Sequence, residues 1–179
     1  MARSFYSTLT VPVLETERLN LRGHRVEDFA ASSAMWADPV VTRHIGGRPL
    51  SAEDSWSRLL RYVGHWALFG FGYWVVEEKA SGNFIGELGF ADYKRGMEPP
   101  LEGTPEIGWI LATEFHGKGY ATEAVRAAVA WGDQHFGAGP TACLIDPENF
   151  ASIRVAEKCG YRKSHVATYK GQSTLVLVR

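Results

Sequence analysis

One segment, residues 105–136, limits what this chain can fold into more than any other. Mostly apolar residues run from Pro105 to Ala112, and a turn containing Gly117 and Gly119 follows them. After the turn, small and apolar residues recur at positions 121, 124, 125, 128, 129, 132 and 136. That spacing predicts a helix that packs one face against a sheet. The segment therefore indicates a strand, a glycine-rich turn and a helix from Tyr120 to Phe136.

The start of this helix is suited to binding an anion. The first helical turn has backbone N–H groups without intrahelical partners, and the helix dipole adds positive charge there. Gly117 and Gly119 would let the backbone approach a diphosphate closely. The turn lacks the Gly-x-x-x-x-Gly-Lys pattern of ATP and GTP loops, and Thr122 stands where the dinucleotide pattern has its third glycine. Taken alone, the glycine pair is equally compatible with an ordinary helix cap.

The rest of the chain mixes strands and helices, which predicts a mixed sheet with helices on its faces. We expect strands at 18–22, 73–78, 83–93, 105–112, 141–145, 161–169 and 173–178, and helices at 27–37, 51–67, 120–136 and 150–159. Residues 94–104 are expected to form a loop. With 179 residues, the chain is expected to form a single domain (1–179), of which residues 1–12 are a flexible N-terminal arm.

The composition narrows the class of protein. The net charge is −1 without a basic block, so we expect neither a nucleic-acid nor a membrane partner. No stretch approaches the ~20 apolar residues of a membrane span, and the first ten residues lack the apolar run of a signal peptide. Cys143 and Cys159 do not form a close pair. We expect a cytoplasmic protein without a metal site.

Three motifs in order resemble the GCN5-related N-acetyltransferase (GNAT) family. The cofactor motif of that family is Gln or Arg, two residues, Gly, one residue, then Gly or Ala. His116, Gly119 and Ala121 occupy these positions, and His116 departs from the usual residue. Residues 149–161 resemble the family's Asn-x-x-Ser helix that ends in Gly and an aromatic residue. Residues 14–19 resemble the start of one branch, the ribosomal-protein alanine N-acetyltransferases.

The resemblance implies the fold and the co-substrate. The fold would be α+β, a mixed, mostly antiparallel, splayed sheet flanked by helices, with the acyl-CoA in a V-shaped opening between strands 105–112 and 141–145. Acetyl-CoA is the implied co-substrate. The residues expected to contact it are Ile110, Leu111, His116, Gly117, Lys118, Gly119, Tyr120, Ala121, Thr122, Asn149 and Ser152.

The resemblance further implies transfer of an acetyl group to an amine by direct attack. The acceptor is either a protein N-terminal α-amino group or a small-molecule amine, and the protein is either a monomer or a homodimer. A non-catalytic acyl-CoA-binding sensor or interaction domain is the alternative function.

Acetyl transfer needs a group that takes a proton from the amine and a donor for the developing oxyanion. The N–H of Ile110 is the expected oxyanion donor. Glu106, on the same strand, is the first candidate for the base, either directly or through a water molecule. Glu87 on the neighbouring strand is the second candidate, and Asp92 is the third.

The general acid is the least defined group. Many members of the family have a tyrosine in the 150–159 helix, but Ala156 occupies that position here. Ser152 is the expected substitute, unless it only caps the helix beside Asn149. The leaving thiolate can also take up a proton itself, because a comparable thiol has a pKa of ~8.5.

Overall fold

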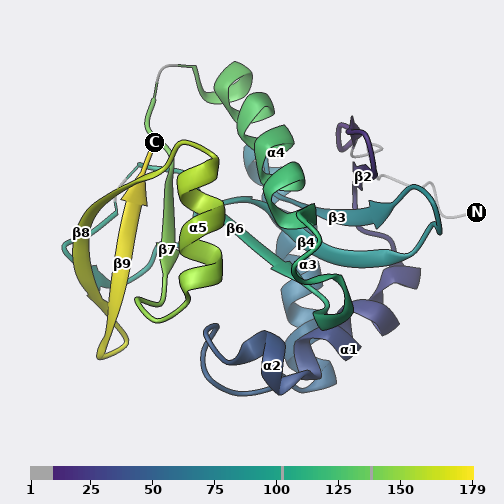
Figure 1. Cartoon of the computed structure of the whole chain (residues 1–179), viewed down its shortest axis with the longest axis horizontal. Helices are drawn as coiled ribbons and strands as arrows, with labels where there is room; N and C mark the ends of the chain where they lie inside the picture. Colours follow the sequence, from purple (N-terminus) through teal and green to yellow (C-terminus); the bar gives the residue numbers. More distant parts are fainter. Residues whose placement is uncertain (1–9, 102, 138) are drawn as a thin grey trace, which may run out of the picture.

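The computed structural model describes residues 10–179 except 102 and 138. Within this part of the chain the strands form one continuous sheet with the order β1-β2-β3-β4-β6-β7-β9-β8-β5 (Figure 1). The strands are β1 (Leu14–Glu15), β2 (Leu19–Arg22), β3 (Tyr73–Glu78), β4 (Phe84–Ala91), β5 (Met97–Glu98), β6 (Glu106–Leu111), β7 (Ala142–Ile145), β8 (Arg162–Tyr169) and β9 (Gln172–Val178).

Helices cover both faces of the sheet. They are α1 (Phe29–Ala37), α2 (Pro39–Thr42), α3 (Ala52–Phe69), α4 (Tyr120–Phe136) and α5 (Phe150–Lys158). Figure 1 shows α4 and α5 in front of the sheet, with α3 behind it and α1 and α2 below. The main core lies under α4, where its buried residues pack against β2, β3, β4 and β6. No helix in the described ranges is long and apolar enough to span a membrane.

The predicted α+β fold is confirmed, and its long elements match closely. The helix expected at 120–136 begins and ends at the predicted residues. The structure adds three short elements that the sequence analysis missed: β1, α2 and β5. β5 lies within the predicted loop 94–104 and pairs with β8, Met97 opposite Tyr169. β1 and β5 have two residues each, too few to show an alternation, and the four residues of α2 make about one helical turn, too few to show a period of 3.6.

The predicted arm at residues 1–12 needs a partial correction. Residues 1–9 lie outside the described part of the chain. Val11 and Pro12 are packed in place: the Trp74 indole donates a hydrogen bond to the carbonyl of Pro12 at 2.9 Å, and Val11 contacts the main core. The buried contacts of Val11 and Pro12 show that the arm does not extend as far as residue 12.

The sheet splays at its centre. β6 pairs antiparallel with β4 along its whole length, from Gly86–Leu111 to Ala91–Glu106. β6 and β7 are parallel and pair at a single position, Glu106 opposite Ala142. Beyond that pair the two strands diverge, which confirms the V-shaped opening that the resemblance implied.

Helix α3, which carries several residues of the site, has well-defined ends. Ser51 caps its N-terminus, and the side chain of Asp54 reaches back to Ser51 in a capping box. Gly70 ends the helix in the left-handed conformation, with φ 72°. The buried face of α3 includes Tyr62 and Trp66, and Arg58 and Tyr62 line a cavity beside β6.

Candidate active site

The opening between β6 and β7 is a cleft of about 670 Å³, called the cleft below. The end of β6, the turn before α4, the start of α5 and the segment after α2 all line it. The predicted cofactor residues that line the cleft are Ile110, Leu111, His116, Gly117, Gly119, Tyr120, Ala121, Thr122, Asn149 and Ser152. Lys118 is the exception, because its ammonium lies over the ring of Phe115, 5.3 Å from the centroid.

The turn before α4 contains two glycines in the left-handed backbone conformation. Gly117 and Gly119 have φ values of 73° and 82°, which favour glycine. Arg18, in the connection between β1 and β2, holds this turn in place through two contacts. Its guanidinium donates to the carbonyl of Lys118 at 3.0 Å and pairs with Glu123 on the first turn of α4 at 2.7 Å. The turn is therefore preorganised by a residue remote in sequence.

His116 has a positional role in this turn. Its Nε2 lies 2.8 Å from the carbonyl oxygen of Leu111. A carbonyl only accepts, so Nε2 carries the proton and donates it to this bond. The side chain thereby ties the turn to the end of β6.

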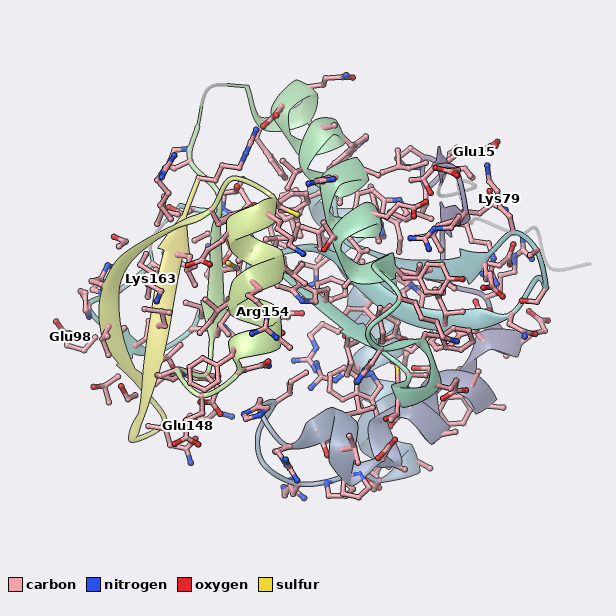
Figure 2. The ribbon with its side chains drawn as sticks, viewed as in Figure 1. Glu15, Lys79, Glu98, Glu148, Arg154 and Lys163 are labelled. Atoms are coloured by element: carbon pink, nitrogen blue, oxygen red, sulfur yellow. The ribbon has the colours of Figure 1, made fainter. Side chains whose placement is uncertain are left out.

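Three cations that the sequence analysis missed also line the cleft: Arg43, Arg154 and Lys158. Figure 2 labels Arg154 on α5. Next to these cations, Phe150 is 64% exposed. The three cations and the N-terminus of α4 can bind phosphate groups, and Phe150 can contact an apolar group. The chemistry of the cleft therefore fits coenzyme A, which carries both kinds of group.

The hydrogen-bond register of β6 decides which of its backbone groups face the cleft. The Ala112 N–H donates to Ile85 on the β4 side at 3.0 Å, whereas the Pro105 carbonyl accepts from Ala142 on the β7 side at 3.0 Å. Because the side alternates at each residue, Ile110 N–H points to β4 and Trp109 N–H points to the cleft. The expected oxyanion donor, the Ile110 N–H, is therefore turned toward β4, and the N–H groups of Trp109 and Leu111, one residue to either side, are turned toward the cleft.

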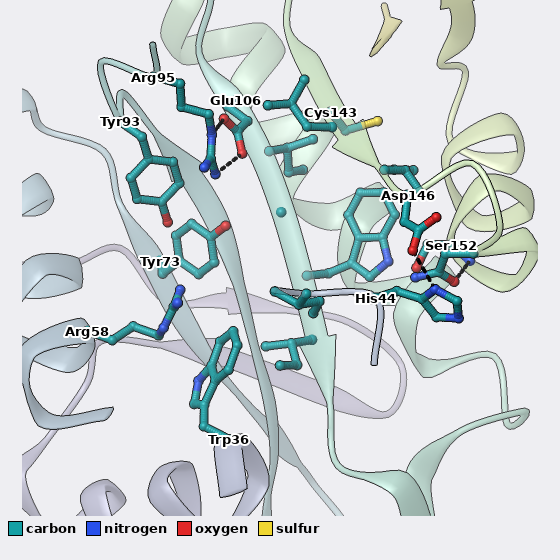
Figure 3. A pocket seen from close by; sticks show the side chains of 18 of the residues that line it. Trp36, His44, Arg58, Tyr73, Tyr93, Arg95, Glu106, Cys143, Asp146 and Ser152 are labelled. Atoms are coloured by element: carbon teal, nitrogen blue, oxygen red, sulfur yellow. Dashed lines mark hydrogen bonds and ion pairs between the residues drawn. The ribbon is translucent and has the colours of Figure 1, made fainter. Parts of the chain in front are cut away.

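A second cavity of about 140 Å³, called the inner pocket below, adjoins the cleft on the α3 side of β6 (Figure 3). Tyr62, Tyr73, Tyr93, Trp36 and Arg58 form much of its wall. The two cavities share six lining residues: His44, Ile45, Trp109, Ile110, Asn149 and Ser152. A ligand in the inner pocket would therefore meet a ligand in the cleft at β6.

A histidine and an aspartate lie where the two cavities meet. His44 follows α2, and Asp146 follows β7. Nδ1 of His44 and Oδ2 of Asp146 are 2.8 Å apart. Figure 3 shows the pair beside Ser152. The sequence analysis missed both residues.

The acetyltransferase (GNAT) domain family matches residues 18–162. This match covers most of the chain and both cavities. The chain belongs to the GNAT acetyltransferase family. It is therefore an acyl-CoA-dependent N-acetyltransferase that uses acetyl-CoA as co-substrate and transfers the acetyl group to an amine.

Individual relatives agree with this assignment. The chain is 40% identical over 156 residues to the uncharacterized protein YkkB of Bacillus subtilis, covering 84% of this chain and 86% of the relative. It is 29% identical to the crystal structure of an acetyltransferase from Agrobacterium tumefaciens, with a TM-score of 0.82 and 95% coverage of both chains.

The resemblance to the ribosomal-protein acetyltransferases is visible in the fold. RimL, a ribosomal L7/L12 α-N-protein acetyltransferase solved in complex with coenzyme A, has a TM-score of 0.75 at 14% identity, covering 94% of this chain and 97% of RimL. At this identity the similarity concerns the fold alone.

Glu106, the first candidate for the base in this GNAT chain, is held by an arginine. It lines the inner pocket. Both of its carboxylate oxygens accept from Arg95, at 2.6 and 2.8 Å. Arg95 also lies over the rings of Tyr93 and Tyr169, 4.6 and 4.9 Å from their centroids. Glu106 therefore forms a bidentate ion pair in the wall of the pocket.

Glu87, the second candidate, is fully buried beneath α1 and lines neither cavity. It accepts from Ser32 at 2.7 Å and from the Trp36 indole at 3.0 Å, and His24 lies 3.4 Å away. Burial raises the pKa of this carboxyl, but His24, Ser32 and Trp36 lower it more, so the net pKa is below its usual value. These contacts anchor α1 to β4. Asp92, the third candidate, binds Lys94 on the surface at 2.6 Å.

The start of α5 holds the predicted Asn149 and Ser152 at the junction of the cavities. The Asn149 side chain accepts from the Ser152 N–H at 3.1 Å and thereby caps the helix. The Ser152 side chain lines both cavities. Ala156, where many GNAT members have a tyrosine, is fully buried in the core.

The anion-binding turn yields a first prediction. Replacing Gly119 with alanine forces a side chain into a positive-φ position, which costs roughly 1–2 kcal/mol and shifts the backbone of the turn. The turn would hold the co-substrate equally in the ground and transition states, so we expect KM for acetyl-CoA to rise about tenfold with little change in kcat. Initial-rate kinetics with varied acetyl-CoA measure this effect.

Gly82 supplies the control for this measurement. It also has a positive φ of 72° and open space around it, but it lies in the β3–β4 turn. Gly82→Ala should leave KM for acetyl-CoA unchanged. Equal kinetics for both variants would show that the turn at residue 119 does not hold the co-substrate.

Proposed function

We propose that this GNAT protein acetylates a compact small-molecule amine that enters the inner pocket. The observation that carries the proposal is the junction of the two cavities at Trp109, Ile110 and Ser152. The inner pocket, at about 140 Å³, suits a small acceptor better than the N-terminal segment of a folded protein. The amine would reach the acetyl group from the α3 side of β6.

We assign the removal of the amine proton to His44, held by Asp146. The acceptor amine is a cation at neutral pH and must lose a proton before it attacks. Partial burial raises the pKa of Asp146, but the N–H of Glu148 and the side chain of His44 lower it more, so the carboxylate stays ionised. An ionised Asp146 accepts from Nδ1–H of His44, which leaves Nε2 to take the proton.

The same geometry supports the roles of the groups around the reacting carbonyl. Acetyl-CoA supplies the thioester. The Trp109 N–H would donate to the carbonyl oxygen as negative charge develops there. The Ser152 hydroxyl, at the junction of the cavities, is the group on α5 that would donate a hydrogen bond to the departing sulfur. The amine nitrogen forms the new C–N bond, the C–S bond breaks, and the thiolate leaves with the electron pair.

Direct attack is further supported by the state of Cys143, a thiol that lines the inner pocket. Burial raises the pKa of this thiol, and the nearby charge of Glu106 raises it further. The thiol therefore stays protonated and is a poor nucleophile. An acetyl-cysteine intermediate is not needed.

An amine screen tests the proposal. Coenzyme A release would be followed with a thiol reagent, and the products identified by mass spectrometry, for compact amines and for peptides with free N-termini. We expect turnover with one or more compact amines and at least tenfold lower kcat/KM with peptides. Better turnover with peptides, or none with any amine despite thermal stabilisation by coenzyme A, would contradict the proposal.

A further inference from the structure

Arg58 is a cation in the wall of the inner pocket that lacks an anionic partner. Its guanidinium stacks on the ring of Trp36, 3.9 Å from the centroid. Burial lowers the pKa of Arg58, but the nearby Tyr62 raises it. Its Nε is buried and makes no hydrogen bond. None of the carboxylates in the described ranges forms an ion pair with it. Figure 3 shows the guanidinium between Trp36 and Tyr73, pointing into the pocket.

The other charged groups around the inner pocket are already paired. Arg95 binds Glu106 through two hydrogen bonds, and Glu87, which does not line the pocket, is held by Ser32, Trp36 and His24. Arg58 therefore gives this side of the pocket a net positive charge. The opposite end, where Asp146 binds His44, carries the negative charge.

A cation in this position is costly without a counter-ion. Removing a guanidinium from water is unfavourable unless an anion or hydrogen-bond acceptors replace the water. Stacking on Trp36 supplies part of the compensation and fixes the plane of the guanidinium. A fixed guanidinium with unused N–H groups is the geometry that recognises a carboxylate.

We propose that the acceptor is an amino acid or a closely similar compact molecule that carries both an amine and a carboxylate. The carboxylate binds Arg58 between Trp36 and the tyrosines, and the amine lies toward His44 and Asp146. The inference rests on the proposed acetylation of a compact amine and specifies its substrate class. The α-amine of a peptide has no free carboxylate beside it, so this arrangement also disfavours protein N-termini.

The test compares matched acceptors on the wild-type protein. α-, β- and γ-amino acids would each be assayed beside the corresponding carboxamide and the corresponding decarboxylated amine. A hydrogen-bonded charge pair of this kind corresponds to roughly 10- to 150-fold in kcat/KM. We expect the acceptor that turns over best to be preferred by that factor over its own carboxamide.

Variants at Arg58 test whether this residue causes the preference for a carboxylate. Arg58→Met should reduce kcat/KM for the amino acid roughly 10- to 150-fold and leave the carboxamide nearly unchanged, so that the preference disappears. Arg58→Lys, which keeps the charge, should retain part of the preference. Arg61→Met removes an exposed arginine of the same helix and serves as the control, with no expected change in the preference.

The outcomes separate this inference from the proposed function. Two results would overturn the inference while the proposed function stands. One is acetylation of amines without any preference for a carboxylate. The other is an equal reduction, in Arg58→Met, of kcat/KM for the amino acid and for its carboxamide. No acetylation of any compact amine would overturn the proposed function itself. Thermal unfolding of each variant identifies a folding defect, and Arg58→Lys then still tests the inference.

Discussion

Replacing His44 with asparagine is expected to lower kcat by about 10²- to 10⁴-fold, the usual contribution of a general base. The asparagine amide can still donate to Asp146 in place of Nδ1, so the loop after α2 stays attached to the β7 end. What the variant loses is Nε2, the atom that would take the amine proton. Initial rates at saturating acetyl-CoA and acceptor measure the effect.

Replacing Asp146 with asparagine tests the second residue of the His44–Asp146 pair. The asparagine amide can donate to Nδ1 of His44, which would place the imidazole proton on Nε2 and prevent it from acting as the base. We therefore expect kcat to fall about 10²-fold or more, although the side chains remain almost isosteric. Because the pKa of Asp146 is below its usual value, the wild-type pair should keep its ionised carboxylate throughout the neutral range.

The control for both variants is His165→Asn, at an exposed position on β8. It should leave kcat unchanged. A different result would be a kcat within about threefold of the wild type in both His44→Asn and Asp146→Asn, together with a higher KM for acetyl-CoA. In that case the pair would only hold the loop after α2 in place beside the cleft. That outcome would remove the base from the proposed mechanism.

The long elements of the fold could be predicted because their patterns are local. The spacing of small residues from Ala121 to Gly132 fixes α4, and Ser51 with Asp54 signals the start of α3. The short elements depend on contacts remote in sequence. β5, for example, is a strand only because Met97 meets Tyr169 of β8.

The cleft and the inner pocket differ in the same way: the first depends on local patterns and the second on contacts remote in sequence. The residues expected to contact acetyl-CoA lie at the end of β6 and in two short motifs, and with the exception of Lys118 they line the cleft. The inner pocket is formed by residues from separate segments of the chain, so no sequence motif predicts it. His44 and Asp146 are 102 positions apart, and neither stands in a pattern that suggests catalysis.

Glu106 shows where prediction from the strand pattern ends. Its side chain lines the inner pocket on the α3 side of β6. Its partner Arg95 lies in the segment expected to be a loop, and no local signal couples the two residues. An interpretation of Glu106 as a base follows from its position alone, whereas the ion pair indicates a structural role.

Replacing Glu106 with glutamine separates these two roles. Arg95 would lose its anionic partner while only 23% exposed, and breaking a buried ion pair from one side costs about 3–5 kcal/mol. Because Arg95 retains some contact with solvent and stacks on Tyr93 and Tyr169, we expect a loss near the lower end of that range. kcat, measured on folded protein, should stay within about tenfold of the wild type. Denaturant unfolding and initial rates measure the two effects separately.

The double variant Arg95→Met/Glu106→Gln strengthens this test. It removes the unpaired cation, so it should recover much of the stability lost in Glu106→Gln, because an apolar replacement of a buried pair is often neutral or stabilising. A catalytic base would behave in the opposite way: Glu106→Gln would lose 10²-fold or more in kcat with little change in the free energy of unfolding, and the double variant would recover no activity. That result would return the role of the base from His44 to Glu106.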